Sequence, residues 1–292
     1  MEPIKYRGRL ITASDIEFMR ELIANNPTLS RRALSAVLCE AWDWRQPNGV
    51  LRDMVARGLM LLLHRAGHIE LPAPRRINPN PLAKRRKPSI DNIDVDVTPI
   101  ECSLAELKPL EFRLVRRTEW NPLFGELIEK YHYLGYSQPV GAHLKYMIFA
   151  GNRPVACLAW CSAARRLAPR DNFVEWQKEA RANNIHFIAY NTRYLIMPWV
   201  KVPNLASHIL GQMVKQLPRD WQKAYGHPLY FLETFIDPAL YKGTCYRAAN
   251  WVPLGLTTGR GHKDSLGQVN RPIKEVLGYP LVRRFRERMA EL

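Results

Sequence analysis

The chain has 292 residues, which is enough for one or two domains, and its 47% hydrophobic content excludes a disordered polypeptide. Its 43 Lys and Arg residues outnumber its 27 Asp and Glu residues, which gives a net charge of +16 and favours a polyanionic partner such as DNA. A basic protein without a nucleic-acid role is the alternative. The sequence contains no apolar run of membrane-spanning length, so we expect a cytoplasmic protein without a membrane partner.

Residues 1–72 carry the pattern of three short helices followed by an extended segment. Ser14 and Glu17 have the spacing of a capping box, and Ser30 is placed to cap a second helix. Apolar residues at helical spacing predict a third helix over residues 50–66, with residues 68–71 extended. This order indicates a winged-helix-like DNA-binding module, with a small helical bundle as the alternative. The residues expected to contact DNA are Arg31, Arg32, Arg45, Gln46, Asn48 and Arg52.

Residues 73–110 form a predicted linker that is rich in proline, basic in its first half and acidic in its second half. Lys84, Arg85, Arg86 and Lys87 are consecutive cations, which predicts either an arm that follows DNA phosphates or a solvated loop. Arg260, in a later glycine-containing loop, is a further candidate for a phosphate contact.

Residues 111–292 alternate between strand-like and helical patterns. Gly151 and Asn152 mark a hairpin turn between two apolar strands. The alternation predicts an α/β (α+β) fold in which a mixed sheet is flanked by helices. The expected strands are residues 112–116, 144–150, 154–161, 190–199, 229–236 and 251–257, and the expected helices are residues 120–131, 172–183, 207–217 and 243–250.

This order of elements resembles the GNAT acyltransferase superfamily, in which a loop between a strand and a helix binds the pyrophosphate of the cofactor. The resemblance implies that the matching loop is the one that contains Lys201, Asn204, Ala206 and Ser207. The loop departs from the family pattern, because Asn204 replaces a glycine and Pro203 has no amide N–H. It is therefore either a cofactor cradle or a structural turn; acyl-CoA is doubtful, and the cofactor is unknown from the sequence.

Two further stretches are more specific: YHYLGY at residues 131–136, and ETFID followed by GTCYRAANW within residues 233–251. Together with LSRRAL at 29–34, WRQPNG at 44–49 and TRYL at 192–195, they resemble the DruA family of the Druantia anti-phage system over nearly the whole chain. The second stretch also resembles the phage Mom family, GNAT-fold enzymes that modify adenine in DNA. These resemblances imply a DNA-binding protein that acts in anti-phage defence.

The candidate chemical centre contains His132 and Tyr133, which lie at the predicted end of a helix. An imidazole can act as a general base near neutral pH and a phenol can donate a proton. An aromatic helix cap that packs on the sheet is the alternative. Tyr246 and Asn250, in the GTCYRAANW motif, are further candidates that could bind a base, a cofactor or one another.

Two carboxylates complete the predicted centre. Glu233 and Asp237 share one face of an extended strand and interrupt an apolar run, which favours a functional role and allows a divalent metal ion between them. A buried ion pair with Arg193 or Arg247 is the alternative.

The leading hypothesis is a DNA-binding protein of the DruA type that processes or modifies DNA through its GNAT-like domain. A non-catalytic DNA-recognition protein is one alternative, and a mobile-element protein that transfers strands through a tyrosine nucleophile is another. Besides DNA, these hypotheses allow other defence-system or mobile-element proteins as partners.

Overall fold

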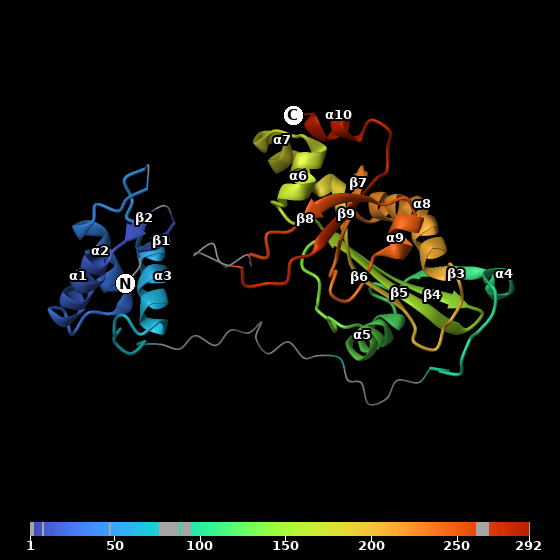
Figure 1. Cartoon of the computed structure of the whole chain (residues 1–292), viewed down its shortest axis with the longest axis horizontal. Helices are drawn as coiled ribbons and strands as arrows, with labels where there is room; N and C mark the ends of the chain where they lie inside the picture. The colour runs from blue at the N-terminus through green and yellow to red at the C-terminus, as the bar shows by residue number, and fades with distance from the viewer. Residues whose placement is uncertain are drawn as a thin grey trace. The chain divides into compact units, whose positions relative to one another are not determined.

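The computed structural model describes residues 3–7, 9–46, 48–75, 88, 95–260 and 269–291. These residues fall into two compact units, one within residues 3–75 and one from residue 88 onward (Figure 1). Each unit has its own hydrophobic core. The predicted basic arm at Lys84, Arg85, Arg86 and Lys87 lies outside the described residues. No helix within the described ranges is long and apolar enough to cross a membrane.

The first unit contains three helices and a two-stranded antiparallel hairpin. Thr12 rather than Ser14 caps the first helix, because its side chain accepts from the amide of Asp15 and the Asp15 carboxylate accepts from the amide of Thr12. Ser30 caps the second helix as predicted. The elements are β1 (Ile4–Tyr6), β2 (Arg9–Ile11), α1 (Ala13–Ala24), α2 (Arg31–Ala41) and α3 (Asp53–Arg65).

The predicted wing after the third helix does not form. Residues 68–71 contain no strand, and the amide of Leu71 instead donates to Nδ1 of His64, 3.3 Å away, so the segment folds back onto the end of α3. The hairpin of this unit precedes α1 rather than following α3. The three predicted helices are therefore confirmed, whereas the short strand expected at residues 68–71 is absent.

The second unit is built on a seven-stranded mixed sheet (Figure 1). Only one neighbouring pair, the fourth and fifth strands across the sheet, is parallel; the other pairs are antiparallel. Across the sheet the strands are β3 (Leu110–Leu114), β4 (His143–Ala150), β5 (Arg153–Ser162), β6 (Ile188–Ile196), β7 (Phe231–Ile236), β9 (Glu275–Pro280) and β8 (Val252–Leu256).

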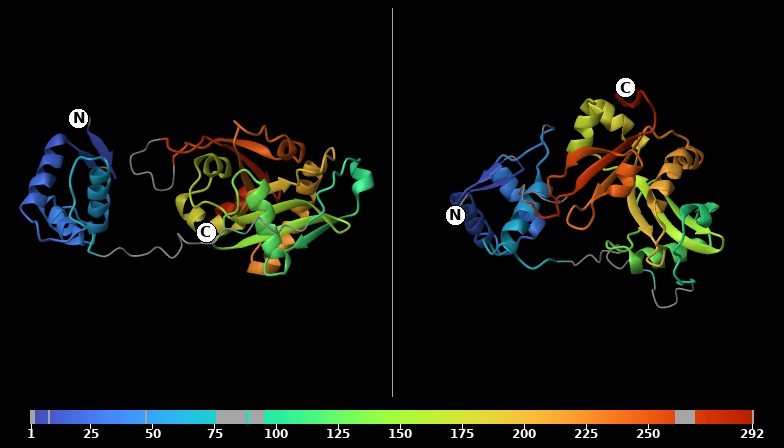
Figure 2. Two further views of the ribbon diagram at one scale, coloured as in Figure 1. Left: turned by 90° about the horizontal axis from the view of Figure 1, so that it is seen from below. Right: turned by 45° about the vertical axis from the view of Figure 1, so that its right-hand side comes forward.

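Helices cover both faces of this sheet (Figure 2). Lys145 and Tyr146 are consecutive in β4 and therefore point to opposite faces. Lys145 donates to Asn121 of α5 (Trp120–Tyr131), whereas Tyr146 donates to Asp220 of α8 (Leu205–Tyr225). The shorter helices are α4 (Leu104–Leu107), α6 (Ala168–Val174), α7 (Lys178–Asn184), η1 (Ile185–Phe187), α9 (Thr244–Ala248) and α10 (Phe285–Ala290).

The predicted α/β class, a mixed sheet with flanking helices, is confirmed. The hairpin β4-β5, the strand-loop-helix unit β6-α8, and then β7, α9 and β8 follow the GNAT-like order expected from the sequence. Two details differ. Strand β9 was not predicted and lies between β7 and β8, and the predicted helix 172–183 is divided into α6 and α7 because Glu175 adopts a left-handed conformation with φ 62°.

Candidate functional site

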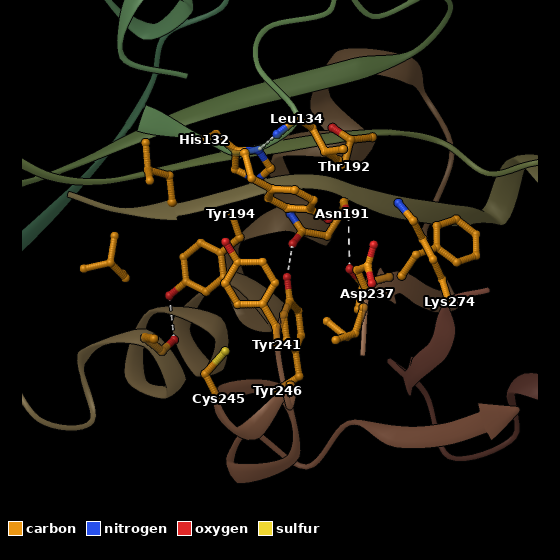
Figure 3. A pocket seen from close by; sticks show the side chains of 18 of the residues that line it. His132, Leu134, Asn191, Thr192, Tyr194, Asp237, Tyr241, Cys245, Tyr246 and Lys274 are labelled. Carbon is orange, nitrogen blue, oxygen red and sulfur yellow. Dashed lines mark hydrogen bonds between the residues drawn. The ribbon is translucent and has the colours of Figure 1, made fainter. Parts of the chain in front are cut away.

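The candidate site is a cavity at the point where the two parallel strands separate. β6 and β7 pair only from Ile188 with Phe231 to Asn191 with Thr234. Beyond Asn191, β6 continues to Ile196 alongside β5 alone, so a gap opens between β6 and β7. A cavity of about 340 Å³ fills this gap, and side chains project into it from β6, β7, the end of α5 and the α9 region (Figure 3). Its size suits a small ligand.

Aromatic side chains dominate the cavity wall. The rings of Tyr133 and Tyr241 lie at the mouth with their centroids 5.3 Å apart, and 42% and 51% of their surfaces are exposed. Burial raises the pKa of Tyr133, Tyr190 and Tyr194, so these phenols stay protonated at neutral pH and act as hydrogen-bond donors. The tyrosines in the wall are Tyr131, Tyr133, Tyr190, Tyr194, Tyr241 and Tyr246.

His132 follows the last residue of α5 and lines the same cavity. Its ring stacks on Tyr133 with centroids 4.9 Å apart, and its Nδ1 accepts from the amide of Leu134 at 3.2 Å. Burial, followed by the charges of Arg193 and Lys274, lowers the pKa of His132 to about 4. The imidazole is therefore neutral at pH 7, and because Nδ1 accepts, the assigned proton is on Nε2. It is a hydrogen-bond donor and a weak base.

Asp237 is the carboxylate of the cavity. It comes directly after β7, is half-buried, and accepts from the amide of Ala239 at 3.2 Å. Its charge contributes to the raised pKa of Tyr133, which places the carboxylate close to that phenol. Lys274, from the approach to β9, lines the cavity as well. The cavity thus combines one acceptor carboxylate with the ammonium groups of Lys242 and Lys274, phenols and an imidazole that donate.

The structure does not bring Glu233 to this centre. Glu233 is fully buried and accepts from Arg170, which is also fully buried, at 3.1 Å. Arg170 in turn contacts Asp171 at 2.8 Å. The buried ion pair is thus the correct alternative, although its partner is neither Arg193 nor Arg247. Glu233 and Asp237 do not converge on a metal ion, and the described residues contain no group of three or more metal-ligating side chains.

Tyr246 and Asn250 have structural positions. The hydroxyl of Tyr246 donates to Oδ1 of Asn191 at 2.5 Å, and Nδ2 of Asn191 donates to the carbonyl of Ala159 at 3.0 Å. These two side chains therefore form a fixed, satisfied part of the cavity wall. Asn250 is exposed outside the cavity with φ 63°, a left-handed conformation that asparagine tolerates better than most residues. Its predicted catalytic role stays a prediction.

The loop before α8 is held by several hydrogen bonds and an ion pair of its own. Lys201 is paired with Glu101 at 2.7 Å, and its amide donates to the carbonyl of Ile100. Asn204 adopts φ 62° as the N-cap of α8, and the Ser207 hydroxyl donates back to the Asn204 carbonyl at 3.0 Å. Ala206 lines the cavity, but its carbonyl accepts from Tyr194. Pro203 has no N–H, so the loop offers fewer amide donors than the expected pyrophosphate pattern, and its role in cofactor binding stays a prediction.

The predicted DNA-contacting residues of the first unit differ in their exposure and in their contacts. Arg31 donates to the carbonyl of Pro72 at 2.6 Å, and Arg45 contacts Asp43 at 2.9 Å. Arg45, Gln46 and Asn48 lie between α2 and α3, ahead of the third helix, and their contact with DNA stays a prediction. The side chains of this set that remain exposed are Arg32, Arg45, Gln46 and Asn48, and Arg260 is exposed in the second unit.

Several residues of the cavity were not predicted. Asn191, Thr192 and Tyr194 are polar residues in the middle of β6, and such residues inside a strand pattern could have drawn attention to this segment. Lys274 carried no comparable signal, because the strand that it precedes was itself missed.

Comparisons with known proteins give the following matches. Solved structures similar to the chain include the ribosomal-protein-S18-alanine N-acetyltransferase from Escherichia coli, at 9% identity, TM-score 0.36, and coverage of 59% of this chain and 94% of that one. Aminoglycoside acetyltransferase AAC(6')-Ib, in complex with coenzyme A and kanamycin, matches at 13% identity and TM-score 0.39, over 62% of this chain and 98% of that one. No curated protein sequence matches. The model of the family described as Druantia protein DruA matches residues 63–276, which is more than half of the chain. This protein therefore belongs to the DruA family.

Proposed function

We propose that this DruA family member acts on DNA in anti-phage defence, and that the cavity between β6 and β7 receives one nucleobase. Membership of the family implies the role in defence. The observation that carries the proposal is the lining of the cavity, in which aromatic rings surround one carboxylate and several donors.

A nucleobase fits this lining for two reasons. Its flat ring can stack on aromatic side chains such as Tyr133 and Tyr241, which are exposed at the mouth. Its edge carries both donors and acceptors, and these can pair with the Asp237 carboxylate and with His132. Enzymes that act on a base within DNA extrude it into such a pocket, where stacking and edge contacts hold it.

Asp237 is the group best placed for proton transfer at a bound base. It can accept a hydrogen bond from an exocyclic amino group and take up a proton, while neutral His132 donates to an acceptor on the ring. A tyrosine nucleophile has less support, since burial raises the pKa of Tyr133, Tyr190 and Tyr194. The alternative is a protein that recognises DNA without catalysis, and the experiment must distinguish this protein from an enzyme.

The test replaces Asp237 by asparagine, which keeps the shape of the side chain and removes the base. We expect Asp237→Asn to melt within a few degrees of the wild type and to bind DNA, yet to lose protection in a plaque assay with the complete defence system. Glu287→Gln, a carboxylate-to-amide change at a residue that is 69% exposed, is the matched control and should protect like the wild type.

Two results would contradict the proposal. Full protection by Asp237→Asn would show that the carboxylate does no chemistry and would favour a protein that recognises DNA without catalysis. A 2-aminopurine base within an oligonucleotide provides the second measurement, because extrusion from the stack changes its fluorescence. We expect this fluorescence change with the wild type and not with Tyr133→Leu. The same fluorescence change in the variant as in the wild type would show that the nucleobase does not bind in the cavity.

A further inference from the structure

A second hollow lies away from the cavity, between the edge strand β3 and the helix α8. It is a groove of about 840 Å³. His208, Gln212, Lys215 and Arg219 follow one another at helical spacing along α8 and form one wall. Lys108, two residues before β3, contributes to the opposite wall. Among the side chains that line this groove there is no carboxylate.

The cations of this groove are not neutralised by ion pairs within the described part of the chain. Lys108, Lys215 and Arg219 are exposed, and none forms an ion pair with a residue that the structure describes. Nearby cations are paired: Arg113 of β3 contacts Glu111 at 2.6 Å, and Lys201 contacts Glu101 at 2.7 Å. Lys108 and Lys215 also lower the pKa of His208, after burial, which places both charges near this ring.

The remaining lining suits a nucleic-acid strand. Leu110 and Phe112 of β3 are half-buried and offer an apolar surface to sugar carbons and base rings. Gln212 can donate to phosphate oxygens irrespective of base sequence, whereas Gln216 already donates one N–H to Asp220 at 3.3 Å. From His208 to Arg219 the stripe extends roughly 16 Å along the helix axis, at about 1.5 Å per residue. This length accommodates several phosphates.

We propose that the groove between β3 and α8 binds the backbone of a single nucleic-acid strand, with Lys108, Lys215 and Arg219 contacting its phosphates. The proposal does not depend on chemistry in the cavity. An anionic lipid surface is less suitable, since the cations line a hollow with an apolar floor rather than a flat face.

The experiment measures the affinity of the full chain for a labelled single-stranded DNA oligonucleotide of mixed sequence. Lys108→Gln, Lys215→Gln and Arg219→Gln are combined in one variant. If three phosphate contacts are lost, affinity falls about 50-fold at 150 mM salt and the slope of log affinity against log salt decreases by about two. The matched control combines Lys178→Gln, Arg283→Gln and Arg284→Gln, which removes the same charge from exposed positions outside the groove.

We expect the control to change affinity by less than about threefold and to keep the slope of the wild type. Equal losses in both triple variants would overturn the proposal, since net charge alone would explain them. The proposal would also fail if the groove variant lost binding to phosphatidylserine vesicles but not to DNA.

Discussion

Glu233 and Arg170 form the most deeply buried ion pair among the described residues, and their burial predicts a large effect on stability. Glu233→Gln removes one of the two carboxylates that compensate Arg170, Asp171 being the other, so we expect a loss of about 1–3 kcal/mol and a melting temperature lower by several degrees. Thermal melting of the purified variant checks this. Glu275→Gln, in the exposed pair with Arg247, should cost less than about 1 kcal/mol; equal effects of the two changes would contradict the ranking by burial.

His132 predicts a contribution to acid sensitivity. Its pKa is lowered from 6.5 to about 4, so between these values the unfolded chain binds more protons than the folded one. The free energy of unfolding should therefore decrease as the pH falls through this window. His132→Asn keeps an acceptor for the amide of Leu134 and does not titrate, so its stability should fall less between pH 6.5 and pH 4. Denaturant melts at several pH values measure this; parallel curves for the two proteins would exclude it.

Two glycines provide a matched test at the level of elements. Gly211, within α8, has open space where a Cβ would lie, so Gly211→Ala should stabilise the protein by about 1 kcal/mol. A Cβ on Gly278 of β9 would overlap the ring of Phe231 and lie 2.9 Å from Leu254 Cδ1. Gly278→Ala should therefore destabilise by about 1–3 kcal/mol. Denaturant midpoints give both values, and the same sign for both would contradict the predicted packing.

The sequence predicted most elements of the second unit, since their apolar patterns are long and bounded by turns. The helix at 120–131 and the hairpin through Gly151 are the clearest examples. β9 was missed because Gly278 and Pro280 interrupt its apolar pattern. For the site, His132 and Asp237 were recognised as polar residues in apolar surroundings, whereas the separation of Glu233 from them depends on Arg170, distant in sequence.

At the scale of the whole molecule, the charge of +16 predicts binding to DNA that depends strongly on salt. If about six phosphates are contacted, affinity for duplex DNA should fall by roughly 10³-fold between 50 and 200 mM salt. Titration of the full chain at several salt concentrations measures the slope. A flat response would leave the excess of basic residues without a role in DNA binding.

The four residue pairs that join β6 to β7 also set the depth of the cavity. β6 and β7 separate only after Asn191 and Thr234. The end of the paired segment therefore limits how far a ligand can enter the cavity. Each further pair in this ladder would shorten the cavity by about 3.3 Å, and each lost pair would deepen it by the same step. The number of residue pairs between β6 and β7 thus limits the length of a ligand that the cavity can hold. The side chains beyond the last pair determine which ligand of that length binds.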